Sequence, residues 1–154
     1  MGDNTDLTIC EIFEGLSPET LKDFQALGRK EKYADGKMLF GTGEPCSGVY
    51  WVSSGRVDVS VSDDFGRRLQ GRVARRGELL GLKAMLCDEA YAATAQSDGP
   101  SEVTFVTRSK VSAFLSAHPD ATFSIVEQLS HRLGIAFDQL RLLSDLNLSL
   151  LTDA

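Results

Sequence analysis

The sequence holds few of the residues that metal centres and disulfide-stabilised folds require. Its three cysteines, Cys10, Cys46 and Cys87, are far apart and odd in number, so they match neither a disulfide framework nor a Cys-x-x-Cys zinc pair. The two histidines, His118 and His131, lie in helical contexts without a neighbouring ligand residue. This pattern predicts reduced, mostly buried thiols and no metal site.

Long apolar runs and an excess of basic residues are also lacking. No apolar run approaches the roughly 18 residues of a membrane span, and no basic region followed by an apolar core opens the chain. We therefore expect a cytoplasmic protein that has no membrane partner. The net charge is −6, from 22 acidic and 16 basic residues, which argues against these residues gripping a nucleic-acid backbone by themselves.

The usual catalytic patterns are missing as well. The sequence shows no Ser-His-Asp order, no glycine-rich phosphate loop with a lysine and no convincing carboxylate pair. We therefore expect that the chain is not an enzyme.

The most informative stretch of the chain is Phe40–Val59. It predicts two β-strands, Gly48–Ser53 and Arg56–Ser62, joined by a tight turn at Gly55, and in the second strand valines alternate with polar residues. Gly43 and Gly55 stand where the backbone needs a positive φ. By periodicity alone the two strands form an ordinary antiparallel hairpin.

Helices are predicted at both ends of a long strand-like region. Near the N-terminus, Glu11–Gly15 indicates a short helical turn, and Ser17 and Pro18 are suited to the cap and the first residue of a helix. Strand patterns with turn dipeptides then run from residue 30 to residue 107, interrupted by a short helix at Leu82–Leu86. A short helix at Lys110–Ser116 and a long one from residue 119 follow.

The long helix carries an apolar seam with alternating steps of three and four residues. Such a seam is typical of a coiled coil, although a lone helix packed on its own barrel could also show an apolar stripe. A polar residue within the seam, Asn147, is of the kind that fixes register and dimer state. We therefore predict a parallel homodimer through the residues Val126, Leu129, Leu133, Ala136, Leu140, Leu143, Asn147 and Leu150.

Several motifs in order resemble the cyclic-nucleotide-binding (cNMP-binding) domain of the Crp/Fnr transcription regulators. The first is the order Phe40, Gly43, Gly48-Val49-Tyr50-Trp51-Val52, Gly55 and Val57. The second, Gly77-Glu78-Leu79-Leu80-Gly81, is similar to the Gly-Asp-x-x-Gly that opens the phosphate-binding cassette of that family. The arrangement from about Ile12 to Leu151 also fits.

The resemblance implies a mainly β fold, a double-stranded β-helix or jelly roll with short N-terminal helices and a long C-terminal dimerisation helix. It divides the chain into a sensor domain at residues 1–118 and a dimerisation helix at residues 119–154. In the family a helix-turn-helix output domain follows the long helix. That output domain is expected to be absent from this chain. Since DNA would be bound only through the output domain, we expect no DNA binding by these residues alone.

Within the cassette, the sequence departs from family members that bind cyclic AMP. Those members have a glutamate for the ribose hydroxyl after the second glycine, and here that position is Leu82. They have an arginine for the phosphate before a small-small-Thr segment, and here that position is Tyr91, ahead of Ala92-Ala93-Thr94. In those members polar residues of the long helix contact the nucleotide base, and the matching positions here are Ala136 and Phe137. Leu82 and Tyr91 supply neither a carboxylate nor a cation.

We therefore expect no binding of cyclic AMP at physiological affinity, unless Lys83, Arg75 or Arg76 compensates. The native effector and any cofactor are unknown. An apolar lining of Leu79, Leu82, Met85, Ala92, Ala136, Phe137 and Leu140 would suit a hydrophobic metabolite, haem, or no ligand. Haem would need His118, His131, a cysteine or a methionine as axial ligand. The candidate pocket comprises Gly77, Leu79, Gly81, Leu82, Lys83, Tyr91, Ala92, Ala93, Thr94, Ala136 and Phe137.

The resemblance therefore implies the effector-sensing and dimerisation domain of a Crp/Fnr-like transcription regulator, with a degenerate cassette. The alternative is a stand-alone cyclic-nucleotide-binding regulatory module whose ligand contacts are altered.

Overall fold

The structure is a computed structural model that describes residues 17–152, without the side chains of Arg132 and of residues 147–152. The predicted helical turn at Glu11–Gly15 and Cys10 lie outside the described residues.

A short helix, α1 (Pro18–Ala26), opens the described chain. Its start is fixed as the sequence predicts, because the Ser17 hydroxyl accepts a 3.2 Å hydrogen bond from the Thr20 amide and Pro18 occupies the first turn. Phe24 is its buried residue and anchors the helix on the rest of the fold.

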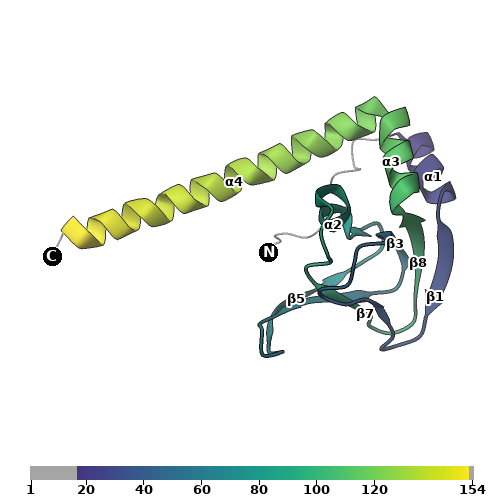
Figure 1. The fold of residues 1–154 in the computed structure, drawn as a ribbon, viewed down its shortest axis with the longest axis horizontal. Helices are drawn as coiled ribbons and strands as arrows, with labels where there is room; N and C mark the ends of the chain where they lie inside the picture. The colour runs from purple at the N-terminus through teal and green to yellow at the C-terminus, as the bar shows by residue number, and fades with distance from the viewer. Residues whose placement is uncertain (1–16, 153–154) are drawn as a thin grey trace.

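Eight antiparallel strands form two four-stranded sheets, which confirms the predicted jelly roll (Figure 1). The first sheet has the order β1-β8-β3-β6 and the second β2-β7-β4-β5. The strands are β1 (Arg29–Tyr33), β2 (Met38–Phe40), β3 (Gly48–Ser54), β4 (Val57–Ser62), β5 (Arg68–Ala74), β6 (Leu79–Leu80), β7 (Thr94–Ser97) and β8 (Ser101–Thr107).

The prediction that β3 and β4 pair as a hairpin is wrong. β3 pairs with β6 and β8, whereas β4 pairs with β5 and β7, so the turn at Gly55 carries the chain from one sheet to the other. Gly55 has a φ of 83°, and a Cβ at this position would lie 2.5 Å from the carbonyl oxygen of Pro100. The predicted positive φ is confirmed here and at Gly43, where φ is 89°.

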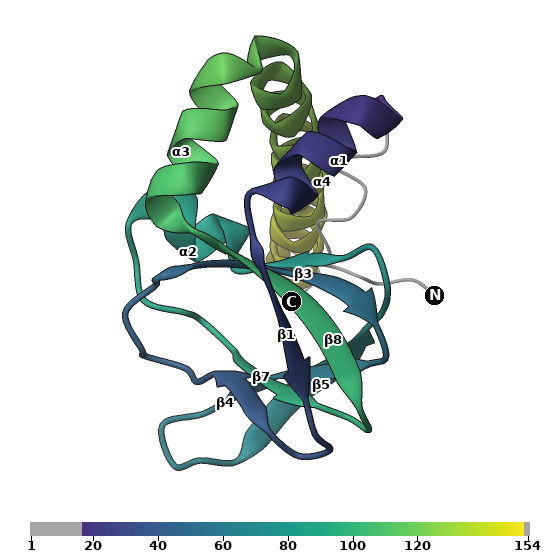
Figure 2. The same cartoon turned by 90° about the vertical axis from the view of Figure 1, so that its right-hand side faces the viewer.

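Within residues 17–152 three more helices follow, namely α2 (Leu82–Cys87), α3 (Arg108–Ala117) and α4 (Pro119–Thr152). The helices α1 and α3 and the first part of α4 lie together at one end of the roll (Figure 2). The 34-residue α4 then projects away from the roll (Figure 1). Among its described side chains, Ala121 and Ile125 are buried, so α4 is held by its first turns. No helix in the described range 17–152 is long and apolar enough to cross a membrane.

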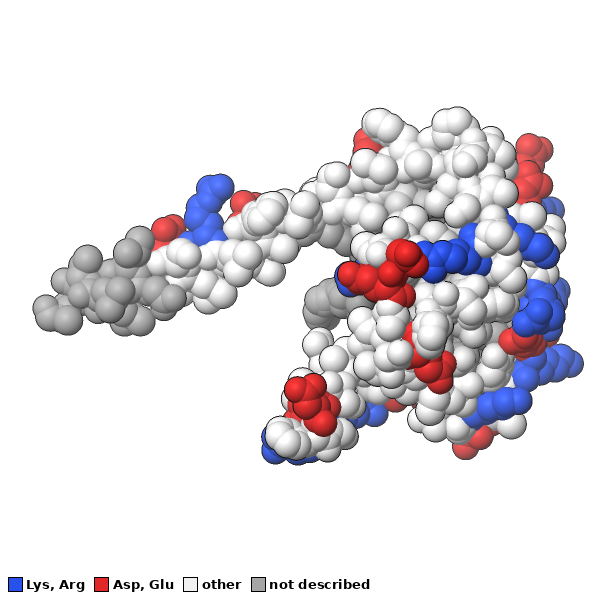
Figure 3. Space-filling view, viewed as in Figure 1, with Lys and Arg blue, Asp and Glu red and all other residues white. Residues whose placement is uncertain are grey.

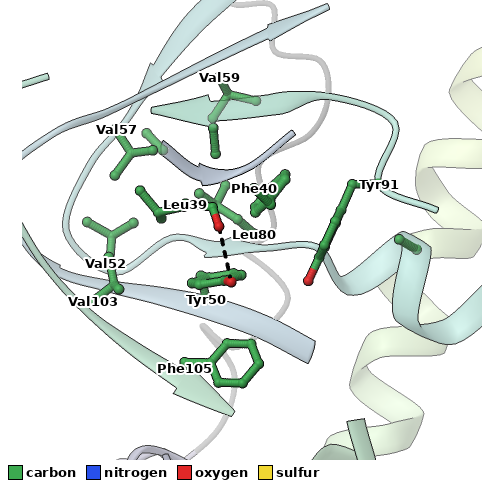
Figure 4. Close-up of a cluster of buried hydrophobic side chains, with 13 residues drawn as sticks. Leu39, Phe40, Tyr50, Val52, Val57, Val59, Leu80, Tyr91, Val103 and Phe105 are labelled. Atoms are coloured by element: carbon green, nitrogen blue, oxygen red, sulfur yellow. Dashed lines mark hydrogen bonds between the residues drawn. The ribbon is translucent and has the colours of Figure 1, made fainter. Parts of the chain in front are cut away.

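The interior consists of two clusters on opposite sides of the first sheet. One lies beneath the helices and contains Phe24, Val49, Trp51, Leu79, Leu82, Met85, Val106, Val111, Phe114, Ala121 and Ile125. The other fills the roll between the sheets and contains Leu39, Phe40, Tyr50, Val52, Val57, Val59, Ala74, Leu80, Ala84, Tyr91, Ala95, Val103 and Phe105 (Figure 4). Successive strand residues such as Leu79 and Leu80 enter different clusters because their side chains alternate between the two faces.

Candidate functional site

The cassette loop Gly77–Gly81 is held against β3 by backbone hydrogen bonds. The Gly77 amide donates to the Val52 carbonyl at 2.8 Å, and the Val52 amide donates to the Glu78 carbonyl at 2.9 Å. Gly77 and Gly81 both have a φ of 92°, a conformation that favours glycine. A Cβ at Gly81 would also lie 3.0 Å from the Tyr91 ring, so the loop and this ring are in close contact.

Glu78 ties the same loop to β5. One Glu78 carboxylate oxygen accepts a 2.8 Å hydrogen bond from the Arg72 guanidinium, and the other accepts from the Arg75 amide at 3.2 Å. Both paired side chains are largely shielded from solvent. Glu78 therefore has a structural role, which the sequence analysis did not assign to it.

The side chain of Tyr91, which the sequence analysis matches to the family's phosphate-binding arginine, is buried inside the roll. The residue is buried, and its ring stacks on Phe40 with centroids 4.0 Å apart. Its hydroxyl donates a 2.7 Å hydrogen bond to the Gly48 carbonyl and accepts from the amides of Ser47 and Gly48 at 3.4 Å. Burial raises the pKa of Tyr91, so the hydroxyl stays neutral. Figure 4 shows the ring beside Phe40.

Three residues of the predicted apolar lining, Leu79, Leu82 and Met85, are buried together in the cluster beneath the helices. Tyr91 of the candidate pocket belongs to the other cluster, inside the roll. Ala92 is exposed, and Ala93 packs against the roll cluster from its edge.

Two polar residues of the candidate pocket, Lys83 and Thr94, already have partners within the chain. Lys83 forms a 2.8 Å ion pair with Glu89 at the surface, and the hydrogen bond to Glu89 raises the pKa of Lys83. The Thr94 hydroxyl accepts a 3.1 Å hydrogen bond from the Thr42 amide. The side chains of Arg75 and Arg76 belong to exposed residues, so they remain accessible to an anion.

The α4 residues of the candidate pocket lie away from the cassette in the single chain. Ala136 and Phe137 are exposed, and α4 leaves the roll before it reaches them (Figure 1). The described length of α4 beyond the roll is largely uncharged surface (Figure 3). The exposed seam residues with described side chains are Val126, Leu129, Leu133, Ala136, Leu140 and Leu143. The side chains of Asn147 and Leu150 lie outside the described residues.

The cysteines and histidines are dispersed. Cys46 is half-buried and Cys87 is exposed, so the expectation of mostly buried thiols is wrong for Cys87. His118 sits at the corner between α3 and α4, where its Nδ1 lies 2.9 Å from the Phe114 carbonyl oxygen and its ring stacks on Phe114. His131 is exposed on α4.

The family model of the cyclic nucleotide-binding domain matches residues 30–118. The chain therefore belongs to the cyclic nucleotide-binding domain family. It is 26% identical over 133 residues to the cyclic AMP receptor protein of Thermus thermophilus, an alignment that covers 86% of this chain and 62% of that protein. It is also 26% identical over 132 residues to glutaminase 1 of Bradyrhizobium diazoefficiens, covering 86% of this chain and 21% of that protein.

Solved structures agree with this assignment. The catabolite activator protein of Thermus thermophilus superposes with a TM-score of 0.76 at 26% identity, over 87% of this chain and 63% of that chain. The sensor domain of the transcriptional regulator DNR of Pseudomonas aeruginosa superposes with a TM-score of 0.71 at 26% identity, over 83% and 86%. The predicted resemblance to Crp/Fnr sensor domains is confirmed. The chain spans about three-fifths of the length of the Thermus relative.

Proposed function

We propose that the chain is the effector-sensing and dimerisation domain of a Crp/Fnr-type transcription regulator of the cytoplasm. In this proposal residues 1–118 sense the effector, residues 119–154 form the dimerisation helix, and a further helix-turn-helix domain contacts DNA. The chain itself performs no catalysis. The likeness to a sensor domain of a transcriptional regulator over most of both chains supports this assignment.

The second part of the proposal is that the cassette does not bind cyclic AMP at physiological affinity. The observation that carries it is Tyr91, whose ring fills the space beside Phe40 and whose hydroxyl already donates to the Gly48 carbonyl. A cyclic phosphate brought to this position would meet an engaged hydroxyl in place of a cation. Leaving such an anion unpaired costs about 2–5 kcal/mol.

The loss of the ribose contact points in the same direction. Leu82 is buried in the cluster beneath the helices, so it offers neither a hydrogen-bond acceptor nor an open position next to the cassette loop. The effector class that fits these groups is an apolar or weakly polar molecule. Haem is not part of the proposal, because His118 lies at the α3–α4 corner against Phe114 and His131 lies on the exposed part of α4.

Sensing would work by a population shift. The effector favours one of two arrangements of the α4 helices across the dimer, and the attached output domain follows that arrangement. The attachment of α4 through Ala121 and Ile125 supports this mechanism, because a small change at its first turns reorients the whole helix.

Isothermal titration of the purified chain with cyclic AMP and then with cyclic GMP tests the cassette. We expect no heat of binding at millimolar ligand. Submillimolar binding would contradict the proposal and would favour a stand-alone nucleotide-binding module in which Arg75, Arg76 or Lys83 replaces the lost contacts. Replacement of each of these three residues by glutamine in turn would then identify the compensating charge. If no heat appears, native mass spectrometry of the dimer detects a co-purified effector.

A further inference from the structure

Arg72 on β5 carries a buried donor that lacks an acceptor. Within residues 17–152, its Nε is the one buried side-chain nitrogen or oxygen atom without a hydrogen-bond partner. The same guanidinium donates from a terminal nitrogen to Glu78 at 2.8 Å, and the Arg72 side chain is 23% exposed. A buried N–H group without an acceptor is costly, and folded proteins contain few of them. The ion pair with Glu78 therefore does not use the full bonding capacity of this side chain.

The Arg72 side chain starts on the inner face of the second sheet. Arg72 lies opposite Val59 of the neighbouring strand β4, and both the next inward-facing residue on β5, Ala74, and Val59 are buried inside the roll. Side chains two residues apart on a strand share one face, so Arg72 shares the face of Ala74. Gln70, two residues before Arg72, is exposed. Arg72 therefore lies where the buried interior of the roll meets solvent.

An apolar surface adjoins the guanidinium at this place. Val61 follows Val59 by two residues on β4, so it lies on the same inner face, and it is half-buried. Gln70 is its partner across the sheet. β5 is an edge strand with β4 as its one neighbour in the sheet, so this surface is open on one side. We call Val61, Gln70 and Arg72 the inner rim of the roll.

The charge next to the inner rim is positive. Residues 72–78 contain three arginines and one glutamate. The glutamate, Glu78, is bound on both carboxylate oxygens, by the Arg72 guanidinium at 2.8 Å and by the Arg75 amide at 3.2 Å. Arg75 and Arg76 are exposed. An oxygen atom with partial or full negative charge is therefore favoured beside Arg72.

We propose that the inner rim binds the effector through an oxygen atom that accepts a hydrogen bond from Nε of Arg72. The effector is an apolar molecule with a carbonyl or carboxylate group, and its apolar part lies against Val61. The proposal rests on the proposed function and names the chemical class of its effector. Glu78 already holds the guanidinium in place, so little side-chain entropy is lost on binding. The bound oxygen also supplies the acceptor that the buried donor lacks.

The Nε–H signal of Arg72 in proton–nitrogen NMR spectra tests the proposal in the unmodified chain. Phenylbutyrate and phenylbutylamine share one apolar part, but the first presents a carboxylate acceptor and the second an ammonium donor. We expect millimolar phenylbutyrate to shift the Arg72 signal and phenylbutylamine to leave it in place. Benzylacetone, which carries a ketone in place of the carboxylate, distinguishes the two acceptors, since a shift with only one of them assigns the effector to that group.

Three results of this titration would overturn the proposal. The first is an unchanged Arg72 signal with both phenylbutyrate and benzylacetone. The second is an equal shift with phenylbutylamine, because an ammonium group offers no acceptor. The third is a shift that follows protein concentration alone, which would assign the acceptor to a second copy of the chain.

A matched pair of variants provides a second measurement. Arg72→Lys keeps a cation next to Glu78 but removes the Nε–H group. We expect it to raise the dissociation constant for phenylbutyrate by about tenfold, the usual effect of losing one hydrogen bond to a charged group. Arg68→Lys is the control, because Arg68 lies on the same strand and pairs with Asp58 at 2.8 Å, and it should leave the constant unchanged.

Equal effects of the two substitutions, or no effect of Arg72→Lys, would count against the inner rim. Thermal unfolding checks that both variants fold, and if Arg72→Lys does not fold, the titration of the unmodified chain decides. Light scattering and the titration with cyclic AMP test the proposed function separately. A dimer that binds neither cyclic AMP nor phenylbutyrate keeps the proposed function and overturns the inner rim, whereas a monomer, or binding of cyclic AMP, contradicts the proposed function whatever the Arg72 signal does.

Discussion

The hydroxyl of Tyr91 donates a 2.7 Å hydrogen bond to the carbonyl oxygen of Gly48, a contact that joins the cassette to the start of β3. The two residues are 43 positions apart in sequence. Removal of this hydroxyl takes the shorter of two donors from the buried Gly48 carbonyl, which also accepts from the Cys46 thiol at 3.5 Å.

We expect Tyr91→Phe to lower the free energy of unfolding by about 1–2 kcal/mol, since the loss of a buried hydrogen bond has roughly this cost. Urea unfolding followed by fluorescence measures the change. The control Tyr33→Phe removes a 2.9 Å hydrogen bond to Glu31 at a less buried site, where water replaces the lost donor. Equal losses in the two variants would show that the Gly48 carbonyl is rehydrated.

Alanine substitutions at two glycines with the same backbone conformation can distinguish the cost of backbone strain from the cost of steric overlap. Gly55 and Gly66 both have a φ of 83°, but a Cβ at Gly66 meets no atom within 4 Å. We expect Gly66→Ala to cost about 1–2 kcal/mol of stability from the left-handed conformation. Gly55→Ala should cost about 1–3 kcal/mol more because of the contact with Pro100. Thermal unfolding of both variants gives the difference, and equal costs would mean that the Gly55 crossing relaxes freely.

The seam of α4 can be tested by a single charge. Leu133→Glu places like charges opposite each other in the proposed parallel dimer, and we expect a monomer mass by light scattering. The control His131→Glu introduces the same charge on an exposed position outside the seam and should keep the dimer. A dimer mass for Leu133→Glu would refute the seam.

The turn that presents Phe65 should depend on pH. The pKa of Asp63 is lowered, chiefly because the Arg67 amide donates to its carboxylate. A carboxyl whose folded pKa is depressed contributes stability above its unfolded pKa of about 3.9, and this contribution is lost as the pH falls through the folded pKa.

In an NMR titration the amide signals of Phe65 and Arg67 should shift together with the Asp63 carboxyl, at a pH below about 4. The Asp63→Asn variant should lose this transition. A midpoint equal to that of the chain in denaturing urea would show that the turn does not hold the carboxylate.

Local signals in the sequence predicted the local features of the fold. Ser17 caps α1 because its hydroxyl reaches an amide three residues on, and this contact depends only on residues next to each other in the chain. The positive φ of Gly43 and Gly55 follows from turn chemistry in the same way. The extent of α4 follows from its apolar periodicity.

Non-local features could not be read in this way. β3 and β4 are adjacent in sequence, but pairing with β8 and β5 places them in different sheets, and no residue near the turn encodes that choice. The sequence comparison likewise showed only that Tyr91 stands at the position matched to the family's arginine. It did not indicate that the ring would stack on Phe40 and hydrogen-bond to Gly48, because those partners come from distant strands.

The attachment of α4 makes it a mechanical lever. The helix is buried at Ala121 and Ile125 and continues to Thr152, a free arm of about 40 Å at a rise of 1.5 Å per residue. A tilt of about 10° at the fulcrum displaces the far end by about 7 Å, which follows from the same rise per residue. A shift of about 1 Å across the roughly 6 Å between Ala121 and Ile125 is therefore amplified to the size of a side chain at the tip of the arm.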